Sequence, residues 1–170
     1  MVALSVEELD DYSRVVVPMI LARFPEWEQF AKLLPRADGA GNVVEFNVPC
    51  PSEAADSGLW LSTADEELSV GFHTHHRHFT DYEDRTNRAQ LEAGLEYASA
   101  IVEDRIGMLS YYGGSQFAGS RSVELPHPDS LPELYEGMGF ARELLGKLPG
   151  WDRVTLRSWS GRFDRDEVRA

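Results

Sequence analysis

Four of the five histidines of this 170-residue chain, His73, His75, His76 and His78, lie within six consecutive positions. Imidazole is the commonest side-chain metal ligand, and histidines two residues apart on a strand project from the same face. A regular strand would therefore place His73 and His75 on one side and His76 and His78 on the other. Because a zinc site uses three or four protein ligands, further ligands must come from elsewhere in the chain. The cluster makes a metal-dependent hydrolase one hypothesis for this protein.

A second interpretation of the histidines is structural. If the alternation of Leu68, Val70 and Phe72 continues without a bulge, Thr74, His76 and His78 lie on the core side of the sheet. There they would be hydrogen-bonded packing residues or would form the floor of a pocket. The sequence has neither an HExxH motif nor a second cysteine to accompany them. We favour a structural or recognition role over a metal site, and a metal site over acid–base catalysis.

Other catalytic patterns are weaker. Cys50 lies between two prolines with no basic residue close in sequence to lower its pKa. Ser115 follows two glycines, a pattern typical of a hairpin turn, and no GxSxG motif or phosphate-binding loop is found. We therefore assign no catalytic or cofactor-binding residue and predict that the chain is not an enzyme.

Charge is the strongest feature of the composition. The chain has 29 Asp and Glu against 16 Lys and Arg, a net charge of −13. Such a field repels nucleic acid and anionic membranes and speeds encounter with a basic partner, although acidity also serves plain solubility. No Lys or Arg occurs between Arg36 and Arg77. The partner-binding candidates from this stretch are Glu53, Asp56, Asp65, Glu66 and Glu67, with Trp60 as an aromatic contact.

The remaining composition is that of an ordinary globular protein, with 42% hydrophobic and 26% charged residues. No apolar run of about 18 residues is present to cross a membrane, and the acidic N-terminus is unlike a signal peptide. A single cysteine cannot form an internal disulfide. These features predict a cytoplasmic protein.

Hydrophobic periodicity predicts a single α+β domain with an antiparallel or mixed sheet of about six strands and helices mainly on one face. The expected elements are helices within 1–35, strands within 42–79, a helix over 86–104, a hairpin over 106–125, a helix over 131–148 and a final strand over 153–159. A capping box at Ser5 and Glu8 should open the first helix, and Pro18 should kink or break it near Val17. A second helix is expected from Pro25 to Leu34, and Thr86 is the expected cap of the helix over 86–104.

Two segments resemble a family of small bacterial proteins. Residues 69–79 resemble its VGF…HxHF strand, and residues 157–164, Arg-Ser-Trp-Ser-Gly-Arg-Phe-Asp, resemble its RSWSGxxD ending. The likeness covers mainly residues 59–79 and 153–164, and His73 and His75 stand where acidic or aromatic residues are expected. The family is associated with polymorphic toxin genes. The resemblance implies an immunity protein that neutralises a cognate toxin and brings no catalytic assignment.

Taken with the charge, this resemblance predicts a monomeric or homodimeric immunity protein that binds a basic toxin domain and neither nucleic acid nor membrane. The alternatives are a metal-dependent enzyme built on the histidine cluster, with zinc as a possible metal, and a structural subunit that self-assembles.

Overall fold

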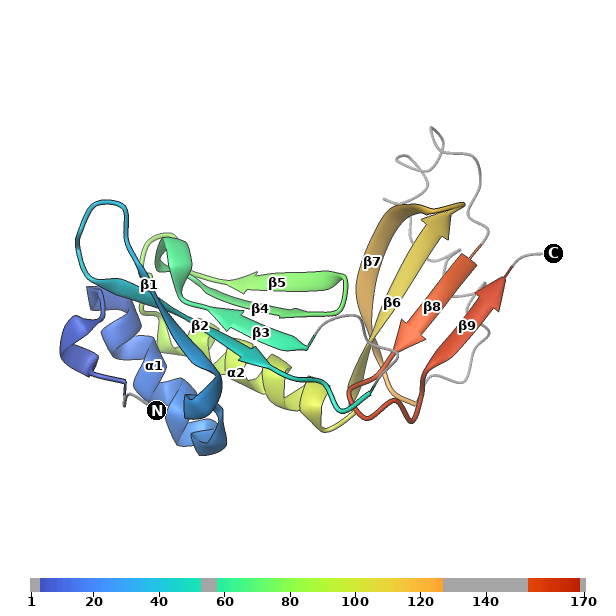
Figure 1. The fold of residues 1–170 in the computed structure, drawn as a ribbon, viewed down its shortest axis with the longest axis horizontal. Helices are drawn as coiled ribbons and strands as arrows, with labels where there is room; N and C mark the ends of the chain where they lie inside the picture. Colours follow the sequence, from blue (N-terminus) through green and yellow to red (C-terminus); the bar gives the residue numbers. More distant parts are fainter. Residues whose placement is uncertain (1–3, 53–57, 127–152, 169–170) are drawn as a thin grey trace. The chain divides into compact units, whose positions relative to one another are not determined.

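The computed structural model describes residues 4–52, 58–126 and 153–168 (Figure 1). Its contacts divide the chain into two compact units. The first unit contains the described residues within 1–49, 57–72 and 76–99, and the second contains those within 50–56, 73–75 and 100–170. Each unit has its own antiparallel sheet. That the two units behave as a single domain stays a prediction.

The first unit is a five-stranded sheet with the order β1-β2-β3-β4-β5. Its strands are β1 (Ala31–Pro35), β2 (Asn42–Val48), β3 (Leu59–Ser62), β4 (Leu68–Phe72) and β5 (His75–Phe79). Helices α1 (Asp11–Arg23) and α2 (Arg88–Val102) both lie along the same face of this sheet (Figure 1). The last three residues of α2 belong to the second unit.

The face that packs on the helices forms the core of the first unit. A Cβ added to Gly94 of α2 would touch Leu68 and Phe79, and Phe79 also packs on Tyr97 of α2. Residues directly opposite in an antiparallel pair share a face, and the register therefore places further apolar side chains on this side. They are Val44, Phe46, Val48, Leu59, Leu61, Val70 and Phe72, all of them buried.

Helix α1 begins at a different residue from the one expected. Asp10 is its N-cap, and the Asp10 carboxylate accepts a 2.7 Å hydrogen bond from the Ser13 amide. Ser5 instead precedes a short 3-10 helix, η1 (Val6–Glu8), and its side chain makes no capping bond. The helix runs through Pro18 to Arg23, so of the kink or break expected near Val17, the break is wrong. Burial of one apolar face against the sheet outweighs the hydrogen bond that proline cannot donate.

The predicted helix from Pro25 to Leu34 is also wrong. Residues Pro25–Phe30 form a 3-10 helix, η2, and Ala31–Pro35 form strand β1. Leu33 and Leu34 pair with Val44 and Val43 of β2, and residues 36–41 form the turn that joins the two strands. Pairing across that turn satisfies the backbone groups of β1 without a helix.

Helix α2 agrees more closely with its prediction over 86–104. The apolar periodicity that predicts this helix runs through Leu91, Leu95, Ala98, Ile101 and Val102; the first four are buried and Val102 is half-buried. The N-cap is Asn87, whose side-chain oxygen accepts from the Ala89 amide at 3.0 Å. Thr86, the expected cap, donates its hydroxyl to Asp84 instead.

The second unit is a four-stranded sheet with the order β7-β6-β8-β9. Its strands are β6 (Ile106–Gly113), β7 (Gln116–Glu124), β8 (Arg153–Arg157) and β9 (Arg165–Val168). The core consists of Leu109, Tyr111, Val123, Val154 and Leu156. The hairpin over 106–125 and the final predicted strand are confirmed, and β9 was not expected. The helix predicted over 131–148 lies outside the described residues.

The α+β class is confirmed. The described strands form two sheets of five and four strands, in place of one sheet of about six. The additional strands are short: β1 lies in a segment expected to be helical, β5 in the segment expected to continue β4, and β9 where no element is expected. Within the described ranges, no helix has the length and apolar character needed to cross a membrane.

Candidate functional site

The histidine cluster lies at a chain reversal. Strand β4 ends at Phe72, residues 73 and 74 form a turn, and β5 begins at His75. His73 has a φ of 53°, a left-handed conformation that side chains other than glycine rarely adopt. The sequence has no Gly or Asn here to indicate a hairpin. The expected continuous strand is therefore wrong, and His76 and His78 are exposed on β5 rather than directed into the core.

The four histidines divide between the two units. His73 and His75 belong to the second unit, where the His75 ring contacts the Ser120 hydroxyl at 3.3 Å. His76 and His78 belong to the first, and their rings meet edge to face at a centroid distance of 5.0 Å. Among the described residues, no three His, Cys, Asp or Glu side chains are grouped to hold a metal ion. The zinc hypothesis stays a prediction that needs ligands from other residues.

The face of the first sheet opposite the helices carries two rows of side chains. One row crosses the strands through Asn47, Trp60, Gly71 and His76, and the next through Glu45, Ser62, Ser69 and His78. Within the described part of this unit, neither α1 nor α2 lies on this side (Figure 1). We call these eight residues the helix-free face. Three residues that the sequence singled out, Trp60, His76 and His78, lie on this face.

Trp60 is the centre of the helix-free face. An added Cβ at Gly71 would lie 2.3 Å from both Cε2 and Nε1 of the Trp60 indole, so the ring rests directly on the glycine. His76 lies on the other flank, with a ring-centroid distance of 6.0 Å. Asn47, in the same row as Trp60, donates its side-chain amide to the Glu45 carboxylate of the next row at 2.6 Å. A fixed, part-exposed aromatic ring therefore lies beside an oriented carboxylate.

Glu67, Ser69 and His78 form a compact polar group at the edge of the same face. The Glu67 carboxylate lies 2.5 Å and the Ser69 hydroxyl 2.8 Å from Nδ1 of His78, and Ser69 donates to Glu67 at 3.0 Å. Both partners therefore use the same ring nitrogen. A serine–histidine–acid relay needs the acid on one nitrogen and the serine on the other. This arrangement orients His78 and does not activate Ser69 as a nucleophile.

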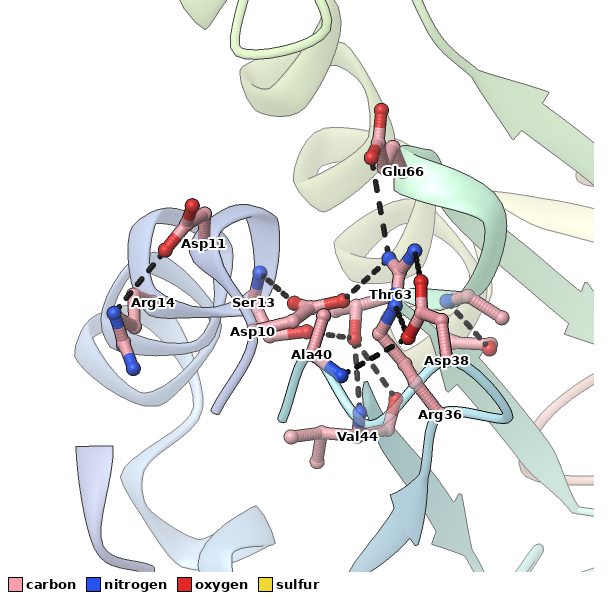
Figure 2. Close-up of polar contacts among 12 residues, drawn as sticks. Asp10, Asp11, Ser13, Arg14, Arg36, Asp38, Ala40, Val44, Thr63 and Glu66 are labelled. Atoms are coloured by element: carbon pink, nitrogen blue, oxygen red, sulfur yellow. Dashed lines mark hydrogen bonds and ion pairs between the residues drawn. The ribbon is translucent and has the colours of Figure 1, made fainter. Parts of the chain in front are cut away.

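Two further acidic candidates among the described residues, Asp65 and Glu66, lie near Arg36, and Figure 2 shows Glu66 beside the Arg36 guanidinium. Arg36 pairs with Asp38 at 2.8 Å and with buried Asp10 at 3.1 Å, and Glu66 lies 3.9 Å away. Hydrogen bonding to Arg36, with help from the Ala40 amide, lowers the pKa of Asp38 to about 2. The group joins the β1–β2 turn to the start of α1.

Asp65 and Glu66 lie in the 3-10 helix η3 (Ala64–Glu66) between β3 and β4, with φ values of 58° and 56°. Glu66 and Arg36 line two hollows of about 480 and 290 Å³. Tyr12 lines the smaller hollow. The Tyr12 hydroxyl is buried and has no hydrogen-bond partner among the described residues. Burial, reinforced by the charge of Glu67, raises the pKa of Tyr12 above its usual range.

The acidity is concentrated in the first unit. Counted over the described residues, this unit has 16 Asp and Glu against 7 Lys and Arg, whereas the second unit has 6 of each. Of the sequence candidates, Trp60, Asp65, Glu66 and Glu67 all lie in the first unit. Glu53 and Asp56 lie outside the described residues.

Sequence reasoning missed several residues of this unit that interact with the candidates. They are Asp10, Arg36, Glu45 and Gly71. Only Gly71 carried a usable signal, because a glycine inside a strand marks a close approach by another group.

The RSWSGxxD-like segment has a structural role in the second unit. The Asp164 carboxylate accepts hydrogen bonds from the Ser158 amide at 2.7 Å, the Ser158 hydroxyl at 3.1 Å and the Ser52 hydroxyl at 3.0 Å. Ser160 also binds Asp104. Gly161 has a φ of 79°, which favours glycine. The segment is a hydrogen-bonded turn between β8 and β9.

The surroundings of Cys50 also fit a structural role. Its thiol donates to the Trp159 carbonyl at 3.1 Å, and burial raises its pKa. A raised pKa lowers the fraction of thiolate, the form that reacts. The geometry gives no support for a nucleophilic cysteine.

No protein-family model matches this sequence, and comparisons with curated proteins and with solved structures found no significant similarity.

Proposed function

We propose that this chain is a cytoplasmic immunity protein that binds and neutralises a basic toxin domain, and that the first unit is its docking surface. The observation that carries the proposal is the separation of charge between the units. The excess of carboxylates over cations among the described residues lies entirely in the first unit. The same unit presents the helix-free face with Trp60 at its centre.

This charge distribution suits rapid capture of a basic protein. A concentrated negative field steers a positive partner and raises the association rate well above the unsteered range. A part-exposed aromatic side chain at the centre of a polar surface is a typical energetic anchor of an interface. The first unit has both features, and the resemblance to immunity proteins supports the same assignment.

The experiment is a binding measurement with the toxin domain encoded next to this chain. We expect a stable one-to-one complex whose association rate falls steeply as salt is raised. The double variant Glu45→Lys/Asp65→Lys, in the first unit, should slow association roughly tenfold at low salt. Glu103→Lys/Glu124→Lys makes the same change of net charge on the second unit and should slow it much less.

Two results would overturn the proposal. One is the absence of a complex with the neighbouring toxin domain. The other is an association rate that is insensitive to salt and equally affected by the two double variants, since this would remove the docking role of the first unit.

A further inference from the structure

The helix-free face has the composition of a site for one particular side chain. None of its eight residues is Lys or Arg, although Lys32 of β1 lies directly opposite Glu45, and the unit around the face is strongly acidic. At its centre, Trp60 is held against Gly71, so its ring is ordered before any partner arrives. A preformed aromatic surface in a negative field favours a cation that can stack.

The nearest carboxylate on this face is positioned for a stacked cation. Asn47 lies directly opposite Trp60, and Glu45 lies two residues from Asn47 on the same face of β2. Such diagonal neighbours are about 7–8 Å apart, within reach of a long side chain. The Asn47 amide orients the Glu45 carboxylate at 2.6 Å. Exposed Lys32 lies directly opposite Glu45 on β1, and among the described residues no ion pair joins either Lys32 or an arginine to Glu45. The carboxylate is therefore available to a partner's cation.

The other carboxylate near this face is less available. Glu67 is held by Ser69 and His78, two strands away from Glu45. Its charge adds to the negative field over the row that contains Ser62 and Ser69. Glu45 is therefore the carboxylate placed to pair with a partner's cation, and Glu67 only adds negative charge nearby.

We propose that the helix-free face binds an arginine side chain of the partner, stacked on Trp60 and ion-paired with Glu45. Arginine fits better than lysine because its planar guanidinium both stacks on an indole and binds a carboxylate through two hydrogen bonds. The proposal rests on the immunity function and identifies the partner chemistry that the docking surface recognises.

The first test uses acetyl-arginine methylamide as the probe and the ¹⁵N–¹H indole resonance of Trp60 as the signal, assigned with Trp60→Phe. We expect a saturable shift with a Kd on the order of millimolar. Acetyl-lysine methylamide should bind several-fold more weakly, and the uncharged citrulline analogue should leave the resonance in place. Glu45→Gln should weaken arginine binding roughly fivefold, while Glu124→Gln on the second unit should not change it.

Equal shifts with arginine and citrulline, or unchanged arginine binding in Glu45→Gln, would overturn the site. So would a response confined to the residues around Arg36. Because Glu45 is on the surface of the sheet, its variant tests the site even if substitution of Trp60 disturbs folding.

A second measurement separates this inference from the proposed function. In the complex with the toxin domain, Trp60→Ala and Glu45→Gln should each raise Kd at least tenfold, and Glu124→Gln should not. A complex of unchanged affinity in both variants removes the arginine site and leaves the immunity function standing. Binding of the arginine probe without formation of any toxin complex would keep the arginine site and remove the immunity function.

Discussion

The indole of Trp60 rests on Gly71, the residue directly opposite it on the neighbouring strand. A Cβ at position 71 would lie 2.3 Å from two indole atoms, far inside van der Waals contact. The glycine therefore sets the position of the ring on the helix-free face, and the relationship can be tested by a mutant cycle.

We expect Gly71→Ala to lower the free energy of unfolding by about 1–3 kcal/mol, because the new methyl group must displace the indole. In a Trp60→Ala background, the same substitution should cost less than about 1 kcal/mol. Urea denaturation of the four proteins measures the coupling between the sites. Equal costs in both backgrounds would show that the ring is not the obstacle.

Asp164 should be important for the stability of the second unit. Its carboxylate accepts three hydrogen bonds, two of them from Ser158. Asp164→Ala should destabilise the protein by about 3 kcal/mol, because it leaves the Ser158 amide without its acceptor. Ser158→Ala should cost less, because the backbone N–H at position 158 can still donate its hydrogen bond to Asp164. Exposed Glu124→Ala serves as the control; if it is as costly as Asp164→Ala, the assigned role is wrong.

The pairing of Arg36 with Asp38 predicts a specific acid titration. Because the pKa of Asp38 is lowered from 3.8 to about 2, its contribution to stability is complete above pH 3.8 and is lost as the pH falls through about 2. Carboxyl ¹³C NMR should place the midpoint near 2. Arg36→Gln should move it most of the way back to 3.8, and Arg36→Lys less far. A wild-type midpoint near 3.8 would contradict the pairing.

Tyr12→Phe should leave stability unchanged or increase it by up to about 1 kcal/mol. The Tyr12 side chain is only 5% exposed, and its hydroxyl has no hydrogen-bond partner among the described residues. Removing an unsatisfied buried hydroxyl while keeping the ring loses no interaction. Exposed Tyr82→Phe is the neutral control in thermal denaturation. Destabilisation by more than about 1 kcal/mol would show that the hydroxyl has a partner.

Periodic segments were predicted correctly where local pattern and tertiary packing agree. The apolar stripe that includes Leu91 and Leu95 predicts α2 because a single helix face must be buried. The hairpin of β6 and β7 follows from two strand-like segments joined by a glycine-containing turn, Gly114-Ser115. The acidity of the first half of the chain was also evident from the sequence. It led to the candidate residues Asp65, Glu66 and Glu67, with Trp60 as a possible aromatic contact.

Predictions failed where a distant partner decides the conformation. Leu33 and Leu34 lie in a segment with a helical pattern, yet pairing with strand β2 holds them in an extended conformation. His73 turns the chain in a left-handed conformation that its residue type does not indicate. Strand β9 is short and mostly polar, so its pairing with β8 has no hydrophobic signature.

By itself, the sequence determined the α+β class, most of the long elements and the strong negative charge, because these follow from local periodicity and from the sum of residue types. Only the tertiary structure decided that Trp60 rests on Gly71 beside Glu45, and that Arg36 joins Asp10 to Asp38. Such contacts depend on strand order and register, and a shift of one residue would send each side chain to the opposite face. No property of the separate segments specifies that register.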